Sequence, residues 1–327
     1  MTPQEILELS EPVEQVYTDV VAQLIENICR HLGEGKDLST QEWELKKLSE
    51  LNALTNESIK IIQQASGKSK KEIEHAISTA LGIGAADTDA LLAGVALTGV
   101  VAEVSSIEHS EALIGLLKSL VDQAEDRANL VNTVMLQSTR QRYIWAINNT
   151  VDTERKLIEK LFSANNLSDL DKQLAKVQEA LNKAVSAVEV GSEARVQALS
   201  RTVKQLADEG ITGFVDAGGH HWSPEAYMNM DIRTTVHNAY IQAQRERSAE
   251  YGIHTFQITS HAGARPRCAP FQGWICSWED GGYTVLDGYG SSHEVHNIYD
   301  TSYGEPAGIF GKLCAEIKPR EHYCLVV

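Results

Sequence analysis

Apolar residues recur at helical spacing through most of the first 210 positions of the chain. Between residues 10 and 33 the apolar repeat consists of Val16, Val20, Leu24 and Ile28. A repeat of four places these side chains on one face of a helix. Ser10 is a suitable N-cap, Pro12 suits a first turn, and Gly33 is a typical stop. The pattern predicts a helix from Ser10 to Gly33.

The same kind of pattern predicts further helices along this half of the chain. One helix begins near Ser39, and two more cover 55–64 and 69–81. Two or three helices are expected within 87–149, and two long ones within 152–208, separated near 165–168. In the first of them Leu45, Leu48 and Leu51 recur every three residues. Gly82 and Gly84 are expected to interrupt the helical pattern.

The composition changes near Gly210. Thirteen glycines follow that position, and eight of the eleven histidines lie after residue 219. The segments 254–258 and 283–286 have strand character, and a helix is expected after Pro224. The predicted fold class is therefore α+β. An extended helical region over 1–205 is joined to a smaller mixed α+β domain over 206–327.

Charge excludes some classes of function. The formal net charge of the 327 residues is -16, of which -5 falls on residues 211–327. Neither half offers the cationic surface that binding to duplex DNA requires. The chain lacks an apolar run near ~18 residues, so no membrane contact is expected. The acidic N-terminus lacks an apolar signal core, so export is not expected either.

A polar stripe marks the helix expected after Pro224. It consists of Arg233, His237, Tyr240 and Gln244, at spacings of four, three and four. An adjacent apolar stripe consists of Ile232, Val236, Ala239 and Ala243. The polar stripe could face the turn-rich segment 260–274, or it could simply face solvent; helical spacing does not decide between the two.

The segment 260–274 gathers several reactive side chains within a short stretch. His261 and Arg265 could bind an anion or polarise a substrate. They could equally hold a loop through hydrogen bonds to carbonyls and carboxylates, which is the commoner role of such residues. Gln272 and Trp274 lie at the end of the same segment.

The cysteines and histidines of the last third raise the question of a metal site. The weak candidates are Cys268, Cys276, His293, His296 and Cys314. Thiolate and imidazole are the ligands that zinc prefers, but the spacing lacks a close Cys-x-x-Cys pair. We therefore expect no bound metal and no other cofactor.

No catalytic constellation is recognisable in the sequence. A nucleophile elbow, an ordered Ser/His/Asp set and a Walker-type phosphate loop are all missing from it. The enzymatic alternative is a pocket formed by Arg233, His237, His261 and Arg265, acting on a phosphate or nucleotide-like group. We expect the chain not to be an enzyme and to have no small-molecule substrate.

Four ordered pieces between residues 205 and 311 resemble the phage minor capsid protein 2 family, relatives of the Mu F-like head morphogenesis proteins. The pieces are Gly213–Asp216 leading to Trp222, Glu225 and Tyr227; Met230–Thr235; Ser260–Pro266 with Gln272-Gly273; and Thr301–Ile309. After Gly311 the sequence departs from the Asn-Cys-Arg-His motif usual in the family, and only Cys314 matches it.

The resemblance implies a structural role in the head of a tailed phage. Such proteins associate with the portal vertex and act in procapsid assembly or early DNA delivery. The implied partners are portal and capsid proteins, with packaged DNA touched indirectly at most. The implied location is the virion, and the host cytoplasm during assembly. The family brings no catalytic set, so the motif positions Arg233, Thr234, His237, His261, Arg265 and Gln272 mark a possible functional pocket only.

Overall fold

The structure is a computed structural model of the 327-residue chain. It describes residues 1–35, 38–96, 106–164, 194–211, 214–215, 219–258, 269–277, 282–286, 292–297 and 323–324.

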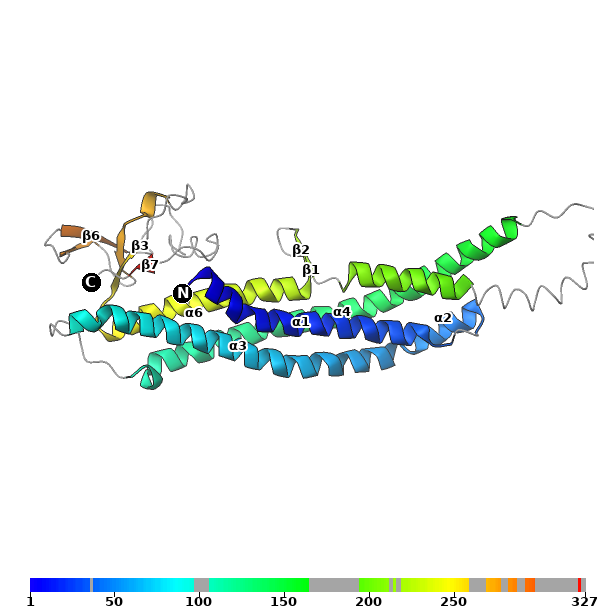
Figure 1. The fold of residues 1–327 in the computed structure, drawn as a ribbon, viewed down its shortest axis with the longest axis horizontal. Helices are drawn as coiled ribbons and strands as arrows, with labels where there is room; N and C mark the ends of the chain where they lie inside the picture. Colours follow the sequence, from blue (N-terminus) through cyan, green and yellow to red (C-terminus); the bar gives the residue numbers. More distant parts are fainter. Residues whose placement is uncertain are drawn as a thin grey trace, which may run out of the picture. The chain divides into compact units, whose positions relative to one another are not determined.

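Long helices make up most of the described chain (Figure 1). They are α1 (Pro3–Gly33), α2 (Thr40–Ser49), α3 (Leu51–Ala96), α4 (Glu111–Ala164), an unlabelled helix over 194–209, and α6 (Pro224–Glu250), with short 3₁₀ turns at Ile107–His109 and Ala269–Phe271. Strands are confined to the part of the chain after residue 213 within the described ranges. This distribution confirms the predicted α+β fold class with a mostly helical N-terminal region.

Helix α1 begins seven residues earlier than the sequence predicted. Ser10 is an interior residue and not an N-cap, because its hydroxyl donates to the Leu7 carbonyl within the helix (2.9 Å). Thr2 and Glu5 hydrogen-bond each other at the true start (2.6 and 3.0 Å). Of the predicted apolar face, Val20, Leu24 and Ile28 are buried, whereas Val16 is half-buried.

Helix α3 continues through Gly82 and Gly84, so the predicted interruption there is wrong. The reason is tertiary packing. A Cβ atom at Gly84 would lie 2.5 Å from the Tyr240 carbonyl oxygen and 3.1 Å from the Ala243 Cβ. Glycine lowers helix propensity, but here it lets α6 approach the α3 backbone closely. Gly84 is therefore a packing residue.

We expect Gly84→Ala to destabilise the protein by about 1–3 kcal/mol, because the added methyl group collides with backbone that cannot move aside cheaply. Gly82→Ala is the matched control on the same helix, since nothing lies within 4 Å of its added Cβ. That control should be neutral or stabilising by up to ~1 kcal/mol. Urea unfolding followed by circular dichroism compares the two. Equal midpoints would contradict the close-approach explanation.

Helix α4 is a single element from Glu111 to Ala164. It therefore spans the position near residue 150 where the sequence suggested separate helices. Of the two helices predicted within 152–208, the structure describes the end of α4 and the helix over 194–209, while 165–193 lies outside the described residues.

A small mixed sheet follows α6. Its strands are β3 (Thr255–Ile258), β4 (Ile275–Ser277), β5 (Tyr283–Leu286), β6 (Ser292–Asn297) and β7 (Tyr323–Cys324), in the order β5-β6-β4-β3-β7. The pair β4–β6 is parallel and the other pairs are antiparallel. The strand predicted over 283–286 is confirmed, and β3 lies within the predicted 254–258. A separate ribbon pairs β1 (Phe214–Val215) with β2 (His221–Trp222).

The chain forms two compact units, each built from separate stretches of sequence. The first comprises Met1–Pro12, Lys71–Glu125 and Asn229–Val327, and the second comprises Val13–Lys70 and Asp126–Met228. The division expected between residues 205 and 206 falls within the helix over 194–209. The predicted division assigned different roles to residues 1–205 and 206–327. Those separate roles stay a prediction.

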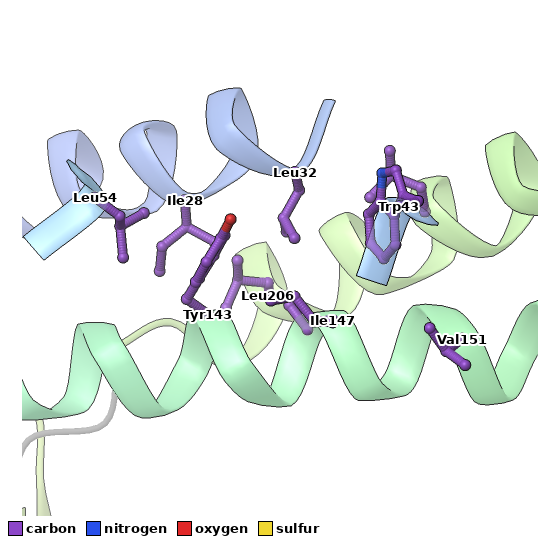
Figure 2. Packing of buried hydrophobic residues seen from close by; sticks show 10 residues of the cluster. Ile28, Leu32, Trp43, Leu54, Tyr143, Ile147, Val151 and Leu206 are labelled. Atoms are coloured by element: carbon purple, nitrogen blue, oxygen red, sulfur yellow. The ribbon is translucent and has the colours of Figure 1, made fainter. Parts of the chain in front are cut away.

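The core of the second unit is a cluster of aromatic and branched aliphatic side chains (Figure 2). Tyr143 and Ile147 project from α4 toward Ile28 and Leu32 of α1 and Leu54 of α3. Trp43 brings α2 into the same cluster, and Leu199 and Leu206 add the helix over 194–209. Burial of these side chains holds α1, α2, α3, α4 and the helix over 194–209 together.

Candidate functional site

The motif residues on α6 lie in two different environments. The apolar stripe of Ile232, Val236, Ala239 and Ala243 is completely buried, as the sequence predicted. Arg233 and His237 on the neighbouring stripe are half-buried. The Arg233 Nε atom is enclosed and has no hydrogen-bond partner within the described ranges.

Thr234 lies on the exposed side of α6 and does not join these groups. Its hydroxyl donates to the Met230 carbonyl one turn earlier (2.9 Å). Such a bond satisfies the hydroxyl locally within the helix. Among the described residues, the hydroxyl of Thr234 is thus bound within its own helix and not to another member of the predicted motif set.

The second half of the polar stripe meets α3. The Tyr240 hydroxyl donates to Asp87 (2.8 Å), and the Gln244 amide donates to the Tyr240 oxygen (3.1 Å). The Tyr240–Gln244 part of the stripe therefore contacts another helix and does not simply face solvent. The segment containing His261 and Arg265 lies outside the described residues.

Gln272 lies just after the 3₁₀ turn Ala269–Phe271 and shortly before β4. The neighbouring Trp274 stacks on His296 of β6, with ring centroids 4.1 Å apart, and the Phe271 ring meets Trp274 edge-on. These ring contacts fix the 269–274 segment to the sheet. Gln272 and Arg233 are not joined by any contact that the structure records.

Of the weak metal candidates, two are register partners on the sheet and a third is paired elsewhere. Cys276 of β4 pairs in register with His296 of β6, whereas His293 pairs with Val285 of β5. Burial raises the pKa of the Cys276 thiol to about 11. This thiol therefore stays protonated near neutral pH. Cys268 and Cys314 lie outside the described residues. Within the described ranges, no three Cys, His, Asp or Glu side chains form a group that could hold a metal ion.

A second polar cluster at the end of α6 was not predicted. The guanidinium of Arg247 is buried and contacts Asp89 of α3 with two nitrogens (2.6 and 3.0 Å). Its third nitrogen donates to Glu250 (2.6 Å), and the Tyr251 hydroxyl donates to Asp89 (3.0 Å). Asp89 and Arg247 are 158 positions apart in sequence, so helical periodicity could not have linked them.

The Arg247 cluster also reaches the start of α4. The Ser110 hydroxyl donates to Glu250, while the same oxygen accepts the Leu113 N–H as an N-terminal cap (3.2 Å). The hydrogen bonds to Asp89 raise the pKa of Arg247 above its usual value. Burial, and then the hydrogen bond and charge of Asp89, raise the pKa of Tyr251. Both pKa shifts keep Arg247 and Tyr251 protonated. The cluster is therefore suited to holding helices together and not to proton transfer.

The second unit contains two comparable clusters. Buried Lys47 donates to the His31 carbonyl and to Glu50 (2.9 Å). His31 lies 3.0 Å from Glu57, and this hydrogen bond holds the pKa of Glu57 below its usual range.

At the other cluster, Arg195 contacts Glu154 through two nitrogens, each at 3.2 Å. A shallow hollow of about 310 Å³ lies between α1 and α3, lined by residues such as Gln23, Arg30 and Lys60.

Comparison with known proteins also indicates a structural role for the chain. The family model described as phage minor capsid protein 2 matches residues 1–165 and 163–317. The chain therefore belongs to the phage minor capsid protein 2 family, which supports a structural role in a phage. Membership of a structural family also favours a role without catalysis.

One curated relative is a protein called "Structural protein" from Lactococcus phage LL-H. It is 26% identical over 274 residues, covering 84% of this chain and 64% of the relative. The chain thus spans less than two thirds of that protein. No solved structure matches the chain. Among the described residues, no helix is long and apolar enough to cross a membrane.

Proposed function

We propose that this chain is a portal-associated minor protein of a tailed-phage head, which acts in procapsid assembly or DNA delivery. The observation that carries the proposal is membership of the phage minor capsid protein 2 family, and the pairing of the buried cations agrees with a role without catalysis. Lys47, Arg195 and Arg247 are each bound by carboxylates or carbonyls of other helices. Paired in this way, they fasten helices together and are not poised to act on a substrate.

The surface favours protein partners over DNA. A net charge of -16 repels phosphate unless a local basic face compensates for it. Exposed apolar side chains such as Leu45 on α2, and Ile114 and Leu130 on α4, provide separate contact points. We therefore propose that region 1–205 contacts portal and capsid proteins, that 206–327 acts as the head morphogenesis domain, and that packaged DNA is touched indirectly at most.

The enzymatic alternative finds no support in the described geometry. Among the described residues, the Thr234 hydroxyl is bound within its own helix, and Tyr240 at the other end of the stripe is bound to Asp87. His261 and Arg265, which the alternative requires, lie outside the described residues. The structural proposal therefore stands ahead of it.

Quantitative mass spectrometry of purified procapsids and virions tests the proposal. We expect the protein in one or both particles at low copy, and co-purification with the portal protein from an infected-cell lysate. The major capsid protein supplies the internal copy-number standard. Absence from both particles would contradict the proposal. Turnover of a nucleotide or phosphoester that disappears in His261→Ala would then favour the enzyme.

A further inference from the structure

Helices α2 and α3 are separated by a single residue, Glu50. The sequence from Lys46 to Leu54 contains neither glycine nor proline, and most of its residues are good helix formers. Glu50 itself stays in the right-handed region, with φ -80°, while its ψ of -7° departs from the helical value. Its N–H still donates to the Lys46 carbonyl, and its carbonyl still accepts from the Leu54 N–H. Local sequence therefore favours one continuous helix, and something else must cause the break.

The break has an identifiable cause at the Lys47 carbonyl. In a continuous helix this oxygen would accept the Leu51 N–H. It instead accepts the Tyr143 hydroxyl from α4 (3.1 Å) and the Glu50 N–H (3.2 Å). A carbonyl oxygen has two lone pairs, and both are then in use. A side chain that enters the hydrogen-bond ladder in this way is a known source of kinks.

Other contacts support the broken arrangement. The Lys47 ammonium is buried and caps the C-terminal end of α1 through the His31 carbonyl, with Glu50 as its counter-ion. Trp43 of α2 is buried in the core cluster. Burial raises the pKa of Tyr143, so its hydroxyl remains a donor near neutral pH.

We infer that the Glu50 joint is a two-position element, in which the Tyr143 hydroxyl and the Leu51 N–H compete for the Lys47 carbonyl. In the bent position Tyr143 holds the carbonyl. In the straight position Leu51 takes it, and α2 and α3 form one helix from Thr40 to Ala96. The joint matters for the surface because α2 carries the exposed Leu45 and Leu48, at 61% and 42% exposure. This inference rests on the fold alone and is independent of the proposed function.

Amide hydrogen exchange of the full-length protein tests the joint at single-residue resolution. Tyr143→Phe removes the competing hydroxyl and keeps the buried ring. We expect the Leu51 amide to exchange more slowly by roughly two- to tenfold, the ratio that one net hydrogen bond supplies. We also expect a longer distance between spin labels attached at the exposed positions Gln41 and Gln63.

Tyr240→Phe is the matched control, because it also removes a tyrosine hydroxyl bond, to Asp87, in the other compact unit. It should leave Leu51 exchange and the label distance unchanged. Unchanged or faster Leu51 exchange in Tyr143→Phe would overturn the inference.

If the phenylalanine variant fails to fold, Glu50→Ala replaces it. That change removes the carboxylate that holds Lys47 and raises helix propensity at the joint. It should again slow Leu51 exchange, and an unchanged rate there would likewise overturn the inference.

Discussion

Glu154→Ala is expected to lower the free energy of unfolding by about 3–5 kcal/mol, the range for breaking a buried ion pair from one side. The side chains of Glu154 and Arg195 are 0% and 3% exposed. Glu154 also accepts the Thr40 hydroxyl (2.9 Å), so it joins α2, α4 and the helix over 194–209. Without the carboxylate, the guanidinium keeps the Leu38 carbonyl and the face of Trp43 but loses the two hydrogen bonds to Glu154.

An exposed ion pair on the same helix provides the matched control. Asp152 and Arg155 lie 3.6 Å apart, and both side chains are more than half exposed (63% and 67%). Asp152→Ala should change stability by less than ~1 kcal/mol, because water screens such pairs. Urea unfolding of both variants measures the difference, and similar losses would contradict the role given to Glu154.

The double replacement Glu154→Met with Arg195→Met separates pairing from packing. Removing both charges leaves no unpaired ion, so the double variant should be more stable than either single variant. If the losses of the single variants simply add, the two side chains are not energetically coupled.

Arg247→Met is expected to destabilise the first unit by roughly 2–4 kcal/mol. The effect should be smaller than that of Glu154→Ala, because the carboxylates left behind are partly solvated: Asp89 is 29% and Glu250 is 22% exposed. Asp89 also keeps the Tyr251 hydroxyl. Arg247→Lys retains the charge but not the two-pronged contact, and an intermediate loss is expected.

Amide exchange locates this second effect. Protection should fall around Asp89 in α3 and around residue 247 in α6, while the core cluster near Tyr143 stays protected. A Lys variant as stable as the wild type would show that only the charge matters. A Met variant as stable as the wild type would contradict the fastening role altogether.

The two ion pairs, Glu154–Arg195 and Asp89–Arg247, are consistent with the proposed assembly role. Each of them joins segments that are distant in sequence, so the helices are held by cross-links between elements in addition to apolar packing. A protein built in this way can present separate helix surfaces to partners while keeping its own helices in place. The particle analysis described above decides whether it does so in a phage head.

Much of the secondary structure could be predicted from the pattern of side chains. The buried faces of α1 and α6 followed from apolar spacing, and β5 followed from its β-branched and aromatic residues between glycines. The family was also recognisable, because four short pieces occur in a fixed order. Such features are local, and the sequence displays local features directly.

The errors in the predicted helix boundaries came from residues whose local preference was overridden. Ser10 and Pro12 indicated a helix start, yet α1 passes through both. Gly84 indicated a stop, yet it is placed where α6 crosses α3. The opposite error occurred at Glu50, where good helix formers surround a break that Tyr143 stabilises from 96 positions away.

What the sequence by itself determined is the class of fold, the helical faces and the family. The tertiary structure alone decided which charges meet: Glu154 with Arg195, Asp89 with Arg247, and Lys47 with the end of α1. The physical reason is range. Helix propensity and apolar periodicity act over one or two turns, whereas a buried charge is stabilised only by the partner that folding brings to it, and sequence spacing carries no record of that partner.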